Sequence, residues 1–378
     1  MRSLSRTHLK RIARVVLGTL VGLALFGFLL AWSGLYSIAA SRGHWAVVEW
    51  LLTFGMRNSV ETHALGIVPP PLDSTDLSTL GGAHFHSGCA YCHGAPGVPL
   101  SPVASSMLPP PPELSTSMRP WRDQELFWIV KHGLKYTGMP AWVAQQRDDE
   151  VWAVVAFLRR LPTLDAAGYR DIALGGLWIP PQSGRQVATT EAASEAGSAC
   201  ARCHGADRRG PTSRLVPVLH GQTVEFLVSA LENYARGRRA SGIMQPVASD
   251  LLPENLKQVA GYYAGLTAPT MPTGPLIDAA SLERGRVLAE RGDITTKVPV
   301  CTSCHSASSL KIYPRLAGQN AAYMINRLRL WKNGLAAHSD TDALMAPIAR
   351  SLSEQQIDDV AAYFSSLNAS AALGKPSR

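Results

Sequence analysis

The residues best suited to chemistry are six cysteines that occur in three pairs. Each pair belongs to a C-x-x-C-H motif: CAYCH at residues 89–93, CARCH at 200–204 and CTSCH at 301–305. This pattern is the attachment signature of c-type haem. Two thiols three residues apart lie on one helical turn, where they can add to the two vinyl groups of a haem, and the adjacent histidine can bind the iron. The motifs use every cysteine of the chain. The sequence therefore predicts three haem c groups, attached through Cys89, Cys92, Cys200, Cys203, Cys301 and Cys304.

Three other uses of cysteine pairs compete with haem attachment. A structural zinc ion takes four ligands, which three separate pairs, each followed directly by histidine, supply poorly. A C-x-x-C redox pair is expected near a βαβ pattern, and the sequence has no such pattern. Structural disulfides are the third alternative. The histidine that follows each pair favours haem.

The N-terminal region predicts a membrane anchor. Residues 1–14 carry five basic side chains and no acidic one, and residues 15–32 contain no charge. About 20 apolar residues span a bilayer, and no small-x-small cleavage site follows the apolar run. We therefore expect an uncleaved transmembrane helix, with a cleaved signal peptide as the alternative. Basic flanks stay in the cytoplasm, which places the haem motifs in the periplasm, outside the inner membrane.

The net charge does not indicate a nucleic-acid partner. The chain has a formal charge of +8, and five of its basic residues lie in the N-terminal flank. Subtracting five from eight leaves +3 for the exported part, which the propionates of three haems would offset. The net charge of the folded surface affects which partners it attracts. No nucleic acid is therefore expected as a partner.

An internal repeat divides the chain into three modules. After its cysteine motif, each module has a Pro-x-Leu string and then a methionine, at spacings of 27, 27 and 31 residues from the proline. An aromatic residue follows each methionine by 18 residues, at Phe157, Tyr262 and Tyr363. The pattern predicts a flank and anchor at 1–35, an amphipathic segment and linker at 36–77, haem domains at 78–165, 190–270 and 276–370, and a linker at 166–189.

The sequence predicts an all-α protein. Each module ends in an amphipathic segment, and no window shows sustained alternation of apolar and polar residues. Ser353 and Gln356 form a capping-box pattern before the last of these segments. Residues 44–63 also have helical spacing. This helix could lie on the bilayer, contact a membrane partner or pack on the first haem domain.

The modules resemble class I cytochrome c domains, in which the cysteine motif, a proline, a methionine loop and a C-terminal helix follow in this order. The last two modules together resemble the tandem dihaem cytochromes c of the c-four type. Both contain P-x-L-x-G-Q, at 217–222 and 314–319, and M-x-P-x-A, at 244–248 and 345–349. The first module, with TGMPAW at 137–142, resembles the cytochrome c domains associated with respiratory oxidases and periplasmic dehydrogenases.

The resemblance implies a full set of iron ligands. The motif histidine would be the proximal ligand and the repeated methionine the distal ligand, which gives His93, Met139, His204, Met244, His305 and Met345. The other imidazole nitrogen would bond to a backbone carbonyl that fixes the tautomer, at Pro112, Pro217 and Pro314. Met107 and Met118 are weaker candidates than Met139. His84 and His86 are expected to have surface or hydrogen-bonding roles, with bis-histidine ligation as the alternative.

Iron with two protein ligands has no open position for a substrate, so the sequence predicts an electron carrier. We expect it to pass single electrons from a quinol-oxidising complex or a periplasmic dehydrogenase to a terminal oxidase or a soluble cytochrome. A narrower alternative is the dedicated cytochrome subunit of a membrane-bound alcohol, aldehyde or sugar dehydrogenase, although such subunits are usually anchored at the C-terminus. The alternative from another class is a haem enzyme similar to dihaem peroxidases. That enzyme would need a module without its methionine, and every module has one.

Overall fold

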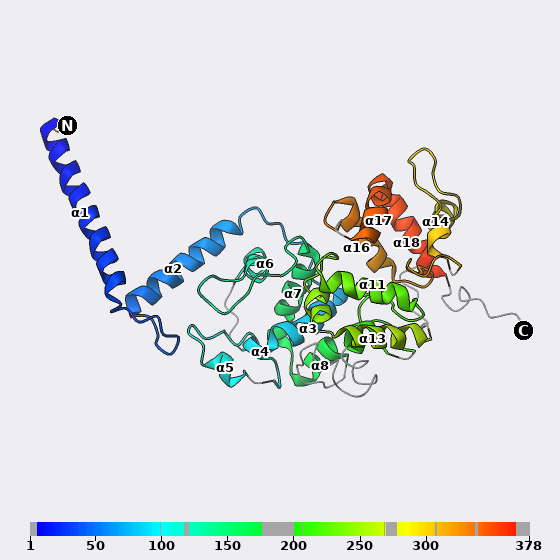
Figure 1. The fold of residues 1–378 in the computed structure, drawn as a ribbon, viewed down its shortest axis with the longest axis horizontal. Helices are drawn as coiled ribbons and strands as arrows, with labels where there is room; N and C mark the ends of the chain where they lie inside the picture. The colour runs from blue at the N-terminus through cyan, green and yellow to red at the C-terminus, as the bar shows by residue number, and fades with distance from the viewer. Residues whose placement is uncertain are drawn as a thin grey trace, which may run out of the picture.

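The computed structural model consists of helices joined by loops (Figure 1). Within the described residues it contains no β-strand, only two isolated bridges, between Ala95 and Val98 and between Asp293 and Val298. The predicted all-α class is confirmed. The described residues are 6–98, 100–116, 121–175, 200–206, 208–267, 269, 278–306, 308–336 and 339–367.

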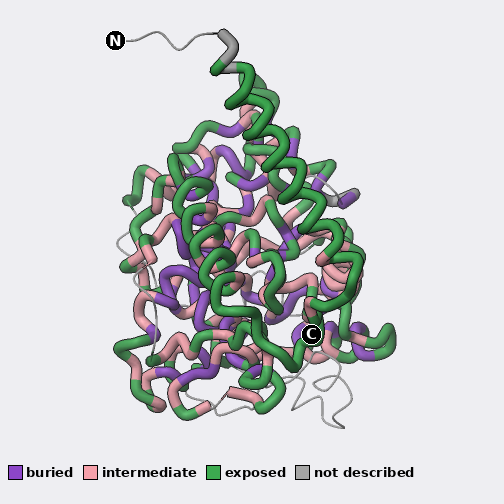
Figure 2. Tube along the Cα trace, turned by 90° about the vertical axis from the view of Figure 1, so that its left-hand side faces the viewer, coloured by how far each residue is buried: buried purple, intermediate pink, exposed green. Residues whose placement is uncertain are grey.

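Helix α1, Arg6–Ser33, protrudes from the helical body (Figure 1). Its segment Lys10–Ser33 is apolar and long enough to cross a membrane, judged by length and composition. The described side chains along it are exposed almost throughout, as the green helix in Figure 2 shows. The expected N-terminal apolar helix is therefore present, in a form that suits either a membrane anchor or a signal sequence.

Helix α2, Ala46–His63, packs on α6, Asp123–His132, near its C-terminal end. Val60 is buried there, and the His63 ring lies 5.6 Å from the ring of Trp128. The first half of the helix carries exposed apolar side chains, among them Trp50, which is 64% exposed, and Phe54. One end of α2 thus packs on α6, while the other end has an apolar surface of the kind that meets lipid or another protein.

We call residues 75–175 the first unit. Tyr169, Ala173 and Leu174 are buried in its core and lie on α8 (Ala166–Leu174), which packs on α3 (Thr75–Gly88). The start of the predicted linker at 166–189 therefore belongs to the packed unit, and 176–189 lies outside the described residues. The helices of the first unit are α3 (Thr75–Gly88), α4 (Ala90–His93), α5 (Pro102–Ser105), α6 (Asp123–His132), α7 (Asp148–Arg160), the 3-10 helix η1 (Leu161–Thr163) and α8 (Ala166–Leu174).

We call residues 200–267 the second unit and 278–367 the third unit. Parts of the predicted domains at 190–199, 276–277 and 368–370 lie outside the described residues. The second unit contains helical residues 200–204, α11 (Val224–Ala235), α12 (Met244–Ser249) and α13 (Pro253–Gly265). The third contains α14 (Ala279–Arg291), α15 (Thr302–His305), α16 (Ala321–Lys332), α17 (Asp340–Ser351) and α18 (Glu354–Ser366).

The predicted capping box at the start of α18 is confirmed. The backbone N–H of Gln356 donates to Ser353 Oγ at 3.1 Å, and the backbone N–H of Ser353 donates to Gln356 Oε1 at 2.9 Å. Two N–H groups that have no partner within the helix are thereby satisfied. The last helix of the third unit consequently begins where the sequence pattern places it.

Two glycines set the distance between crossing helices in the first and third units. Helix α3 meets α7 at Gly81, where a Cβ would lie 1.9 Å from the carbonyl oxygen of Ala153. Helix α14 meets α18 at Gly285, where a Cβ would lie 2.0 Å from the carbonyl oxygen of Asp359. Both partner residues lie four positions before the repeated aromatic residue, Phe157 on α7 and Tyr363 on α18. The same close crossing is thus built into both units.

Substitution of Gly285 with alanine is expected to destabilise the third unit. The new methyl group has no room against the α18 backbone, and overpacking of this kind costs about 1–3 kcal/mol. The matched control is Gly261→Ala in α13, where no atom lies within 4 Å of the added Cβ; better helix propensity should stabilise it by about 0.5–1 kcal/mol. Hydrogen exchange of the α14 and α18 amides measures the difference. Unchanged protection in Gly285→Ala would contradict the crossing.

Candidate haem-binding sites

Each cysteine motif lies at a short helix. Helix α4 follows Cys89, residues 200–204 are helical, and α15 follows Cys301. The backbone N–H of His93 donates to the Cys89 carbonyl at 2.9 Å, and that of His305 donates to the Cys301 carbonyl at 3.0 Å. The helical hydrogen bond places the histidine one turn after the first cysteine. Two thiols and one imidazole are therefore presented together.

The cysteines favour covalent attachment over the other uses of a cysteine pair. None of the six forms a disulfide. Burial raises the pKa of the Cys89 thiol to about 12 and the pKa values of Cys200 and Cys301 to about 11, so these three side chains are neutral thiols near pH 7. Among the described residues, no group of three or more His, Cys, Asp or Glu could hold a metal ion. The two cysteines and one histidine of each motif suit iron in a porphyrin, because the porphyrin supplies four ligands itself.

Each motif histidine is held by the carbonyl of the proline predicted for it. The Nδ1-to-oxygen distances are 2.9 Å from His93 to Pro112, 3.1 Å from His204 to Pro217 and 2.9 Å from His305 to Pro314. A carbonyl only accepts, so Nδ1 carries the proton and the lone pair of the imidazole is on Nε2.

The three imidazoles are also neutral near pH 7. Burial lowers the pKa of His204 to about 4, and the bond to Pro217 opposes this shift only in part. The pKa values of His93 and His305 are lowered by burial in the same way. Neutral imidazole with an available Nε2 is the form that ligates iron. The chemistry of the residues present thus fits a haem at each motif.

The three predicted methionines are half-buried and lie in different local structures. Met139 is in the loop between α6 and α7, where its N–H donates to Thr137 Oγ1 at 3.1 Å. Met244 begins α12, and Met345 lies within α17. The methionine loop expected from the sequence is therefore helical in the second and third units. The competitor Met107 reaches the same loop as Met139, because its Cε lies 2.0 Å from the Cβ position of Gly138; Met118 lies outside the described residues.

The two histidines before the first motif lie inside the first unit. His86 is buried, and its Nδ1 lies 2.8 Å from the hydroxyl of Tyr169. The His84 ring packs edge-on against the indole of Trp142, with 4.7 Å between centroids. Burial, followed by the charge of Arg202, lowers the pKa of His84 to about 4. His86 thus has a hydrogen-bonding role and His84 a packing role, and neither is a surface residue.

The second and third units bind each other through two glutamines in equivalent positions. Gln222 donates from Nε2 to the Arg315 carbonyl at 2.8 Å and accepts from the Arg315 N–H at 2.9 Å. Gln319 donates to the Val218 carbonyl at 3.0 Å and accepts from the Val218 N–H at 2.8 Å. Each carboxamide pairs with the peptide just after the proline that holds the other unit's histidine. The sequence repeat contains these glutamines, but it does not indicate that they cross between units.

Replacement of Gln319 with leucine is expected to weaken the contact between the second and third units. Val218 would keep a buried N–H and carbonyl without partners, which costs about 1–3 kcal/mol. The amide of Val218 should then exchange faster with solvent, while that of Arg315, bonded to Gln222, should change less. Gln258→Leu, on the exposed side of α13, is the control. Unchanged exchange at Val218 would contradict the reciprocal pairing.

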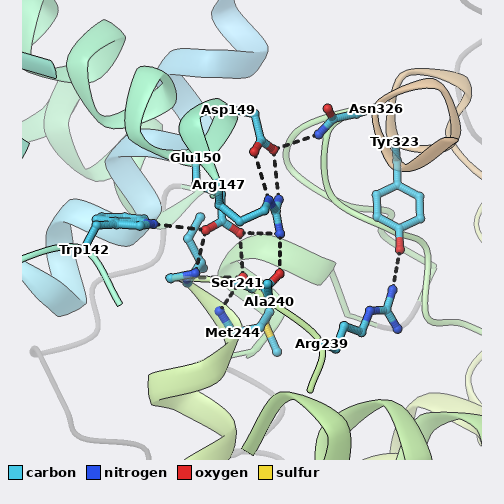
Figure 3. A network of polar contacts seen from close by, with 12 residues as sticks. Trp142, Arg147, Asp149, Glu150, Arg239, Ala240, Ser241, Met244, Tyr323 and Asn326 are labelled. Atoms are coloured by element: carbon cyan, nitrogen blue, oxygen red, sulfur yellow. Dashed lines mark hydrogen bonds and ion pairs between the residues drawn. The ribbon is translucent and has the colours of Figure 1, made fainter. Parts of the chain in front are cut away.

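The first unit contacts both of the others. Asp76, at the start of α3, accepts from the backbone N–H and from Nε of Arg214, both at 2.8 Å. Asp149, at the start of α7, accepts from Asn326 Nδ2 of the third unit at 2.9 Å. Next to it, Glu150 binds the segment of the second unit that leads to Met244 (Figure 3). The sequence pattern does not indicate the role of these carboxylates, because acidic residues in a first helical turn are ordinary.

Comparison with known proteins places the chain in a family. Residues 78–158 match the model described as cytochrome c oxidase, cbb3-type, subunit III, and residues 283–368 match the model for cytochrome c. The thiosulfate dehydrogenase electron acceptor of Stutzerimonas stutzeri is 33% identical over 187 residues, which cover 49% of this chain and 86% of that protein. The chain belongs to the cytochrome c family.

Two further relatives of this cytochrome are of the c4 type. Cytochrome c4 of Pseudomonas aeruginosa is 30% identical over 182 residues, which cover 47% of this chain and 88% of that protein. The solved structure of Acidithiobacillus ferrooxidans cytochrome c4 is 32% identical, covers 44% of this chain and 98% of its own, and has a TM-score of 0.40. The predicted resemblance is confirmed by the curated relatives and by the two matched family models. The protein is an electron-transfer cytochrome that binds haem c covalently.

Proposed function

We propose that this cytochrome carries single electrons along three haem c groups in the periplasm, anchored to the inner membrane by α1. The observation that carries the proposal is the threefold occurrence of one arrangement, in which a cysteine pair precedes a histidine whose Nδ1 bonds to a proline carbonyl. The haem groups supply reversible one-electron chemistry when bound. The ligand pairs would be His93 with Met139, His204 with Met244, and His305 with Met345.

The residues of the chain favour a carrier over a haem enzyme. Each proline carbonyl holds the Nδ1–H of an imidazole, whose free Nε2 would bind the haem iron, and each repeated methionine would supply a thioether as the second protein ligand. A neutral thioether raises the potential and leaves no open position for a substrate. The peroxidase-like alternative requires a unit without this methionine, and all three units have one.

The packing brings all three units into mutual contact. The second unit contacts the third through the segment around Val218, next to the proline that holds His204. It contacts the first unit through Ser241 and Gly242, just before Met244, and through Arg214, three residues before Pro217. The first unit also contacts the third directly, from Asp149 to Asn326. Electrons could therefore pass between any two neighbouring units.

A periplasmic dehydrogenase is the electron donor we favour. The relative from Stutzerimonas stutzeri is named as an electron acceptor of thiosulfate dehydrogenase, and the first unit matches a model for an oxidase subunit. We infer that a dehydrogenase of thiosulfate or a comparable small reductant supplies electrons, and that a terminal oxidase or soluble cytochrome receives them. A quinol-oxidising complex is the competing donor, and stopped-flow reduction by each purified candidate separates the two.

The decisive experiment is a reduced-minus-oxidised spectrum of the detergent-solubilised protein, with and without carbon monoxide, together with its haem content and near-infrared methionine–iron band. Three haems, a full methionine band and no response to carbon monoxide are expected. Carbon monoxide binding at one haem would contradict the carrier assignment and favour the enzyme. Membrane fractionation with α1 intact, and with α1 replaced by a cleavable signal, tests the anchor.

A further inference from the structure

A buried carboxylate of the first unit binds the polypeptide that leads to Met244 in the second unit. Glu150, in the first turn of α7, is 3% exposed. Its Oε1 accepts from Ser241 Oγ at 2.5 Å, and its Oε2 accepts from the Gly242 N–H at 2.6 Å. Trp142 Nε1 also donates to Oε2, at 3.3 Å. Figure 3 shows these groups converging on one carboxylate between the two units.

The bond to Ser241 continues to the proposed iron ligand. Ser241 Oγ, which donates to Glu150, accepts in turn from the backbone N–H groups of Met244 at 3.0 Å and Ile243 at 3.3 Å. A single hydroxyl therefore connects the carboxylate of the first unit to the backbone of Met244. The position of the Met244 backbone is thus tied to a residue that belongs to another unit.

A cation of the first unit holds the other end of the same segment. Arg147 Nη1 donates to the Ala240 carbonyl at 2.8 Å and lies 3.0 Å from Glu150 Oε1. Arg147 also binds Asp149 with two hydrogen bonds of 2.9 Å. Burying charges is costly unless they are paired and hydrogen-bonded, and here each charge has several partners. Arg147 and Glu150 therefore form a buried contact in which both charges are paired and hydrogen-bonded.

The segment between these contacts lies directly against the first unit. At Gly242 an added Cβ would lie 2.1 Å from Trp142 Nε1. The absence of a side chain lets the indole and the carboxylate reach the backbone together. Burial, together with the neighbouring Asp149 carboxylate, raises the pKa of Glu150, while Arg147, Ser241 and Gly242 act in the opposite direction. Ionised Glu150 satisfies all of the surrounding donors, whereas a protonated carboxyl would leave fewer acceptor sites for them.

We propose that Glu150 is a positioning residue for the second haem site, and that through Ser241 and Gly242 the first unit holds Met244 where its sulfur binds the iron. This inference rests on the proposed ligand pair of His204 and Met244. If the inference is right, the binding of iron by Met244 in the second unit depends on the contact between the first and second units. Glu150 touches neither iron nor sulfur, so its effect is on geometry and strength of ligation.

The test measures methionine ligation in full-length protein carrying Glu150→Ala or Glu150→Gln. We expect E150A to lose up to one third of the near-infrared methionine–iron band and to let one haem in three bind carbon monoxide. E150Q keeps a hydrogen-bond acceptor and should lose less. The matched control is Asp148→Ala, which removes an acidic residue from the same helical turn. The side chain of Asp148 is 52% exposed and pairs with Lys131 of its own unit. It should keep the full band.

A double variant assigns the effect to the second site. E150A combined with Met244→Ala should lose no more of the band than Met244→Ala alone, because both changes act on the same iron. A full band and no carbon monoxide binding in folded E150A would overturn the inference. If E150A does not accumulate, E150Q and Ser241→Ala decide by the same two readouts. If Met244→Ala itself leaves the band intact, the ligand assignment fails and the inference fails with it. If Met244→Ala loses one third of the band while E150A keeps all of it, only the positioning by Glu150 fails.

Discussion

Replacing both Cys301 and Cys304 with alanine is expected to reduce the covalent haem content from three to two. The third unit then has no thiol to add to a haem vinyl group, although His305 is still held by Pro314 at 2.9 Å. The first and second units have hydrophobic clusters separate from that of the third unit, so their haems should be retained. The alkaline pyridine spectrum gives the haem count per chain, and the intact mass shows a loss equal to one haem.

The control for this pair is Ser303→Ala, which changes an exposed position between the two cysteines. It should keep all three haems, because it removes no attachment atom. Retention of three haems by the double cysteine variant would contradict thioether attachment in the third unit. Loss of all haem would instead indicate that the three units mature as one, in spite of the separate cluster of the third unit.

Replacing Met345 with alanine is expected to open the iron of the third unit. Without the thioether, one haem in three should bind carbon monoxide, and the methionine–iron band should fall by one third. The potential of that haem should fall by an amount on the order of 0.1 V, within the roughly 0.8 V range that axial ligands control. A redox titration resolved by wavelength, with and without carbon monoxide, measures both changes.

Met324 supplies the matched control in the same unit. It is a buried methionine in the hydrophobic cluster of α16, so Met324→Leu is a volume-conserving change with a cost below about 1.5 kcal/mol. It should leave the potential and the band unchanged. A methionine–iron band that stays full in Met345→Ala and falls by one third in Met324→Leu would exchange the roles of the two methionines. The comparison thus separates a ligand from a core residue, which the sequence register alone cannot do.

The local chemistry of the sites could be predicted from the sequence because it depends on short spacings. The contact from His93 to Pro112 follows from the C-x-x-C-H motif and the Pro-x-Leu string after it. The capping pair of Ser353 and Gln356 follows from a four-residue pattern. Helix α8, with its buried residues Tyr169, Ala173 and Leu174, was not predicted. Its segment follows a proline and precedes two glycines, and these residues are typical of a linker. Its burial is decided by α3, which lies far away in the sequence.

The contacts between units could not be predicted, because they depend on how three folded bodies meet. Glu150 and Asp149 have the sequence pattern of ordinary first-turn acids, and only the docked second unit makes Glu150 a buried acceptor. Gln222 and Gln319 were recognised as repeated residues, yet a repeat gives equivalent places in two units and no relation between them. Burial and crossed hydrogen bonds come from tertiary packing, which no local pattern contains.

The crossed glutamines have a further consequence for how the second and third units associate. Two equivalent residues that each bind the other's partner form an isologous contact, the arrangement found in two-fold homodimers. In this chain the two halves of such a dimer are joined in one polypeptide. Covalent linkage makes their association intramolecular, with an effective concentration of roughly millimolar for a short connection. The pairing of Gln222 with Arg315 and of Gln319 with Val218 is therefore independent of how dilute the protein is.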